Sequence, residues 1–141
     1  MKIDELTPEY ICNKLEEHLN SKHAVDLSVE NMDIKLIRKK IGRLNTVFLV
    51  ERVSTDPKMG WDYVLYGRDF SKYHPDYFCI FNFFGWLTRD LKKKKDRKGC
   101  SERIVKEIIC RYYGINYENK FLGEPSYTIE EIKQKCILLT N

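Results

Sequence analysis

The sequence predicts a single α+β domain spanning residues 1–141, with an N-terminal helix, a β-hairpin at about 46–66 and then two to three helices around an aromatic core. Three observations predict this class. Apolar residues repeat at helical spacing near both ends of the chain. A run of β-branched and aromatic residues lies between them. No linker, internal repeat or low-complexity stretch divides the 141 residues, a length that usually folds around one core.

The first helix is predicted from Thr7 to about Asn20. Thr7 is a suitable N-cap, and Pro8 is favoured at the first helical position. Apolar residues then recur every four positions, which gives one stripe for the core: Ile11, Leu15 and Leu19.

The next segment, Ser28–Ile41, has an ambiguous pattern. Ser28 could cap a helix that stops at Gly42, a residue favoured after a helix end. Its apolar residues, however, follow neither helical nor strand periodicity. We expect a helix here, with a strand as the alternative.

Two strands are predicted to form the hairpin. Thr46–Val53 is rich in β-branched and aromatic residues, and Trp61–Tyr66 has the same character. Between them, Ser54–Gly60 consists of residues that favour turns. A two-stranded ribbon is marginal alone, so it should pack on helices or gain a third strand.

An aromatic segment follows Pro75. Tyr77, Phe81 and Phe84 recur at three- and four-residue spacing, which favours one helix from about Asp76 to Lys95. The alternative is a strand over 77–83 and a shorter helix from Trp86. Gly99 is expected to close the segment.

Two more helices are predicted toward the C-terminus. Glu102–Tyr113 carries Ile104 and Ile108 on one face and opposite charges at i,i+4 spacing on the other, and it should end at Gly114. The last helix should start with a capping box formed by Thr128 and Glu131.

The segment from Arg89 to Lys98 concentrates positive charge, with seven Lys or Arg and two Asp among its ten residues. It has a net charge of +5, whereas the whole chain has +4, so the rest is nearly balanced at −1. This concentration indicates a contact surface for anions. The residues predicted to bind are Arg89, Lys92, Lys93, Lys94, Lys95, Arg97 and Lys98.

Such a cluster suits a non-enzymatic binding protein whose partner is a nucleic acid or an acidic protein. Lysines neutralise phosphates independently of sequence, and arginines add bidentate hydrogen bonds. Two other interpretations remain open. The cations could simply stabilise the negative end of a helix. Aromatic residues followed by lysines also occur in helices that lie on anionic lipid. This aromatic segment, however, is apolar nearly all round, as in a buried helix, which argues against a membrane-surface role.

A rival class is a protein-interaction module, such as an inhibitor, an immunity-type protein or an adaptor. It would bind through exposed tyrosines, Trp61 and the loop 54–60, because Tyr, Trp and Arg dominate binding hot spots.

No catalytic or metal-binding motif is present in the sequence, and we expect neither an enzyme nor a bound cofactor or metal. The five cysteines lack C-x-x-C spacing, and no secretory signal precedes them, which predicts free thiols in the cytoplasm. Cys100 is the candidate reactive thiol, since it should lie just before a helix and among Arg97, Lys98 and Arg103, conditions that lower a thiol pKa. The sequence gives no indication of oligomeric state.

Overall fold

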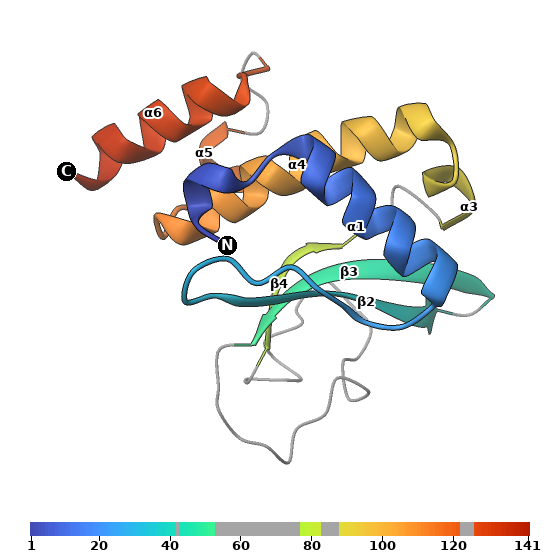
Figure 1. Ribbon diagram of the computed structural model, residues 1–141. Helices are drawn as coiled ribbons and strands as arrows, with labels where there is room; N and C mark the ends of the chain where they lie inside the picture. Colours follow the sequence, from blue (N-terminus) through green and yellow to red (C-terminus); the bar gives the residue numbers. More distant parts are fainter. Residues whose placement is uncertain (42, 53–76, 83–87, 122–125) are drawn as a thin grey trace.

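The computed structural model describes residues 1–41, 43–52, 77–82, 88–121 and 126–141. Helices α1 and α4 lie across one face of an antiparallel sheet, and α6 packs on α4 on the side away from the sheet (Figure 1). The predicted α+β class is confirmed. In chain order the elements are η1 (Ile3–Glu5), α1 (Pro8–Ser21), β1 (Val25–Asp26), β2 (Asp33–Ile41), β3 (Leu44–Arg52), β4 (Tyr77–Asn82), α3 (Thr88–Leu91), α4 (Lys94–Tyr112), α5 (Tyr117–Phe121) and α6 (Ile129–Thr140).

Helix α1 confirms the prediction at its N-terminus. The Thr7 side chain accepts a hydrogen bond from the backbone N–H of Tyr10, and Pro8 opens the helix. The predicted stripe of Ile11, Leu15 and Leu19 is buried against α4 and the sheet. Local capping and packing therefore agree on where this helix begins and which side it buries.

The sheet has the order β1-β2-β3-β4, with every neighbouring pair antiparallel. The expected helix over 28–41 is therefore wrong, because residues 33–41 form β2.

Strand β3 confirms the predicted strand at 46–53, but its hairpin partner is β2, in a continuous register from Asp33 opposite Arg52 to Ile41 opposite Leu44. The other edge of β3 pairs with β4. The predicted strand 61–66 and the loop 54–60 lie outside the described residues.

Both faces of the central strands carry buried apolar side chains. Leu36 lies opposite Leu49, and both belong to the main core under the helices. Ile37 lies opposite Phe48, and both are buried although they point to the other face. The core under the helices is mainly aliphatic, and aromatic rings of Tyr117, Phe121 and Tyr127 cluster at its end.

The aromatic segment does not form the single helix expected over 76–95. Residues 77–82 form strand β4, and α3 is a separate turn of four residues, which agrees with the alternative of a strand followed by a shorter helix. The expected start of that helix at Trp86 lies outside the described residues. Gly99 does not end a segment either, because it lies inside α4. Gly114 and the capping box of Thr128 and Glu131 are as predicted, since Gly114 has φ of 73° and both capping bonds are present.

His18 anchors the C-terminal end of α1. Its ring is buried, with Nδ1 lying 2.7 Å from the backbone oxygen of His23. Its own carbonyl oxygen accepts a hydrogen bond from the Arg38 guanidinium at 3.3 Å. Burial lowers the pKa of His18, and the charge of Arg38 lowers it further, against the raising effect of the hydrogen bond to His23.

This burial predicts a loss of stability in mild acid. Below about pH 6.5 the unfolded chain protonates His18 more readily than the folded chain does, so the free energy of unfolding falls as pH decreases. Uptake of one such proton on unfolding changes the free energy of unfolding by at most about 1.4 kcal/mol per pH unit. The change His18→Gln, which cannot be charged, should remove this part of the slope in urea titrations between pH 7 and 5.5. An unchanged slope in the variant would contradict it.

Candidate functional site

The basic segment 89–98 spans α3, a turn and the start of α4. Lys92 and Lys93 form the turn, and Lys93 is the N-cap of α4, with extended backbone angles and no capping hydrogen bond from its side chain. Lys94 and Lys95 open the helix. The lysines therefore surround the beginning of a 19-residue helix rather than the end of a long one.

This position decides how the charges combine with the helix. The N-terminus of an α-helix carries partial positive charge and several backbone N–H groups without helical partners. Lysines placed here add to that potential, whereas lysines at a C-terminus would offset it. Of the four residues that open α4, only Asp96 is acidic, and it favours the helix start. The interpretation in which the cluster neutralises a helix C-terminus applies only to α3, a single turn.

The exposed part of this cluster is here called the lysine surface: Lys92, Lys93, Lys94, Lys95 and Lys98. All five residues are exposed to solvent. None of them takes part in an ion pair with the carboxylates of the described residues. Their ammonium groups are thus available to an external anion. The side chain of Arg89 is outside the described part.

Arg97 has a different environment from the lysines. It is half-buried, and its Nη1 donates hydrogen bonds to the carbonyl oxygens of Leu91 at 3.2 Å and Lys92 at 2.7 Å. These are carbonyls at the end of α3, which lack helical partners. Arg97 therefore joins the end of α3 to the start of α4, and it fixes the turn that displays the lysine surface.

Ser101 connects this turn to the rest of the molecule. Its hydroxyl donates to the carbonyl oxygen of Arg97 at 2.7 Å and lies 3.1 Å from the Cys12 sulfur on α1. Ser101 is fully buried. These contacts attach the first turns of α4 to α1, so the segment that carries the lysine surface packs against the rest of the protein.

Cys100 is placed differently from what the reactive-thiol hypothesis requires. It lies within α4 rather than before a helix, and its side chain is fully buried. Burial raises the pKa of the Cys100 thiol, nearby Cys12 raises it further, and Arg103 only partly opposes them. A low pKa and solvent access make a cysteine react rapidly as a nucleophile, and Cys100 has neither.

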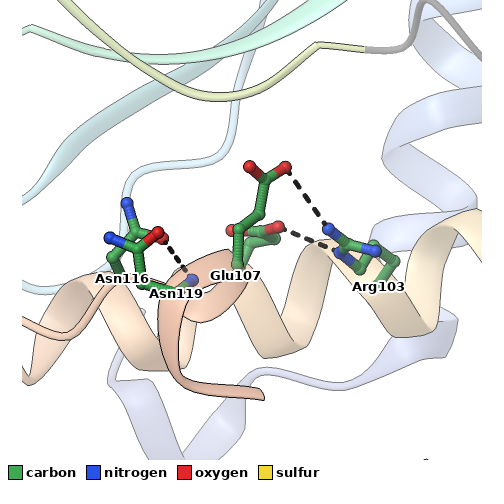
Figure 2. A network of polar contacts seen from close by, with 5 residues as sticks. Arg103, Glu107, Asn116 and Asn119 are labelled. Carbon is green, nitrogen blue, oxygen red and sulfur yellow. Dashed lines mark hydrogen bonds and ion pairs between the residues drawn. The ribbon is translucent and has the colours of Figure 1, made fainter. Parts of the chain in front are cut away.

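A polar network on the other side of α4 was not predicted from the sequence (Figure 2). The Arg103 guanidinium lies 2.9 Å from Glu107 and 3.7 Å from Glu118, and it stacks 4.5 Å from the centre of the Tyr117 ring. Glu107 is one of the i,i+4 charges expected on the face opposite Ile104 and Ile108, and it is buried. Burial raises its pKa to about 7, although the hydrogen bond and charge of Arg103 act in the opposite direction. Its spacing from Arg103 was visible in the sequence, but its burial was not.

The features of the rival interaction module are only partly described. Tyr112 in α4 is 39% exposed, whereas four other tyrosines pack against the core: Tyr10, Tyr113, Tyr117 and Tyr127. The loop 54–60 and Trp61 lie outside the described residues.

Comparisons of the chain with protein-family models, with curated proteins and with solved structures found no match. Within the described ranges, no group of three or more His, Cys, Asp or Glu side chains is arranged to hold a metal ion. None of the helices described is both long and apolar enough to cross a membrane. Function therefore has to be inferred from the chemistry of the described residues.

Proposed function

We propose that this protein is a non-enzymatic binding protein whose lysine surface engages the phosphate backbone of a nucleic acid. The observation that carries the proposal is the gathering of five exposed lysines around the uncapped N-terminus of α4. Ammonium groups and helix N-terminal N–H groups both favour phosphate oxygens. Contacts of this kind to the phosphate backbone position a protein on a duplex without reading its base sequence.

Arg97 supports the site indirectly in this proposal. Because its guanidinium holds the carbonyls of Leu91 and Lys92, it contributes geometry to the lysine surface more than a phosphate contact. We propose the cytoplasm as the compartment, in keeping with the free thiols of Cys12, Cys100, Cys110 and Cys136.

The salt dependence of DNA binding tests this function. With four to five lysines on phosphates, the affinity for a labelled 20-base-pair duplex should fall with a slope of about −4 in a plot of log K against log salt concentration. Fluorescence anisotropy from 25 to 200 mM NaCl measures the slope. Because the contacts are to the backbone, duplexes of different sequence should bind with equal affinity.

An acidic polypeptide distinguishes the other partner class. Poly-glutamate carries carboxylates without phosphates, and it should compete for the protein less well than DNA of equal charge. If poly-glutamate binds more tightly than DNA, the partner is an acidic protein surface and not a nucleic acid. Absence of DNA binding at 25 mM NaCl would contradict the nucleic-acid function.

A further inference from the structure

Two buried cysteines from different helices lie against each other at the junction of α4 and α6. The sulfur atoms of Cys110 and Cys136 are 3.7 Å apart and share a hydrogen bond. Neither side chain has any exposed surface. Cys110 lies in the last turn of α4, and Cys136 lies in the middle of α6, so the contact joins the C-terminal helix to the central one.

We propose that Cys110 and Cys136 are a redox-sensitive pair that closes into a disulfide and locks α6 onto α4. A disulfide has a sulfur–sulfur length of about 2.0 Å, so the two sulfurs need to approach by less than 2 Å. Small rotations of the two side chains and a slight shift of α6 can supply this movement. The proposal stands independently of the binding function.

Helix α6 is the element that such a bond would affect most. Of its twelve residues only Ile132 and Cys136 are buried, and Leu138 and Leu139 are exposed near its end. At its first turns, Lys133 adds an ion pair to Asp4. A helix attached through so few groups opens more easily than the core does. A covalent bond at Cys136 would therefore turn a detachable helix into a fixed one.

The oxidation balances with hydrogen peroxide as the oxidant. One thiol loses its proton, its sulfur attacks a peroxide oxygen, the O–O bond breaks, and a sulfenic acid and one water form. The second sulfur then attacks the sulfenic sulfur, the S–O bond breaks, and a second water leaves. Two thiols are oxidised by two electrons in total, and one peroxide is reduced to two waters.

The environment makes this reaction slow but specific. Burial raises the pKa of both thiols, so little thiolate is present in the packed state. The Cys110 S–H can donate to a Cys136 thiolate, which favours Cys136 as the first sulfur to react. The sulfenic acid formed there would meet Cys110 before any other thiol, because the two sulfurs already touch.

Peptide mapping tests the proposal on the full chain. The folded protein is exposed to millimolar hydrogen peroxide at pH 7.5, remaining thiols are alkylated, and the sample is digested with trypsin without reduction. Cleavage after Lys106, Arg111 and Lys135 gives the peptides 107–111 and 136–141. The expected product is these two peptides joined, with a mass lower by two hydrogens than their sum.

Thermal melting gives a second readout. The bond spans 26 residues of sequence, and closing such a loop should raise the melting temperature of the oxidised protein by roughly 5–10 °C relative to the reduced protein. Cys136→Ala should abolish both the linked peptide and the shift. The matched control is Cys12→Ala, a half-buried cysteine on α1, which should retain both.

Three results would overturn the proposal. The first is complete oxidation of Cys12 with Cys110 and Cys136 still alkylated as separate peptides. The second is linkage of Cys110 or Cys136 to other cysteines in comparable amounts. The third is a linked peptide without any change in melting temperature. Because the mapping uses the unmodified chain, these outcomes do not depend on whether a variant folds.

Discussion

Changing Lys92, Lys93, Lys94 and Lys95 together to glutamate is expected to lower the affinity for duplex DNA by roughly 100-fold or more at low salt. All four residues are exposed and lie at the start of α4, so their replacement removes the favourable contacts and places carboxylates against phosphate. Fluorescence anisotropy at 50 mM NaCl measures the loss. The salt slope should collapse toward zero in the same variant.

A matched control separates the site from net charge. Lys92→Glu with Lys95→Glu changes the net charge by the same amount as Lys2→Glu with Lys120→Glu, and all four lysines are exposed. Only the first pair belongs to the lysine surface. Equal losses of affinity in the two double variants would show that DNA responds to overall charge, and the local binding surface would then be wrong.

The stability of the protein is expected to decrease as pH rises from about 5 to 8 through the titration of Glu107. Burial raises the pKa of this carboxyl from 4.5 to about 7, so the folded chain holds a proton that the unfolded chain releases. The folded state therefore gains from Glu107 being neutral at low pH and loses that gain on passing pH 7. The shift corresponds to about 3 kcal/mol over the whole window.

Glu107→Gln tests this expectation by keeping the shape of the neutral acid. The variant should match the wild type near pH 5 and exceed its free energy of unfolding at pH 8, as measured by urea titration. Glu118→Gln is the control, because Glu118 pairs with the same Arg103 but its side chain is 63% exposed. The pH dependence of stability that arises from His18 has the opposite sign to that from Glu107, and it is the same in both variants. A less stable Glu107→Gln at pH 8 would mean that the ion pair with Arg103 outweighs the cost of burial.

The parts of the fold that were predicted correctly have local signals. Thr7 with Pro8 and Thr128 with Glu131 mark helix starts through bonds within one turn, and neither depends on the rest of the chain. Gly99 shows the limit of such signals. A glycine in a helix costs about 1 kcal/mol relative to alanine, and here the helix continues because Cys100 and Ile104 pack in the core beyond it.

Strand β2 was missed because its two faces are both partly apolar. Ile34 and Leu36 point to the helices, and Ile37 points to the opposite face, where it is also buried. Alternation of apolar and polar residues, the usual sign of a strand, is therefore absent. Arg38 adds to the ambiguity, because it is a charged residue on the helix-facing side of β2. Its guanidinium donates a hydrogen bond to the His18 carbonyl oxygen there.

The candidate site was visible in the sequence as a charge run, but its geometry was not. The sequence placed the lysines after a long helix, where they would offset its dipole, and the structure places them before α4, where they reinforce it. The distinct role of Arg97 and the contact between Cys110 and Cys136 both need three-dimensional packing. Residues 26 positions apart give no periodic signal that could have paired those thiols.

The separation along the chain of the partners α1 and α4 has a consequence for synthesis. The β2–β3 ribbon joins neighbours in sequence and can close once residue 52 has emerged from the ribosome. Ile11 and Leu15, in contrast, pack on a helix that ends at residue 112. A growing chain therefore carries the part of α1 that α4 covers without its partner through most of its translation, and this is the interval in which a chaperone would have the most to shield.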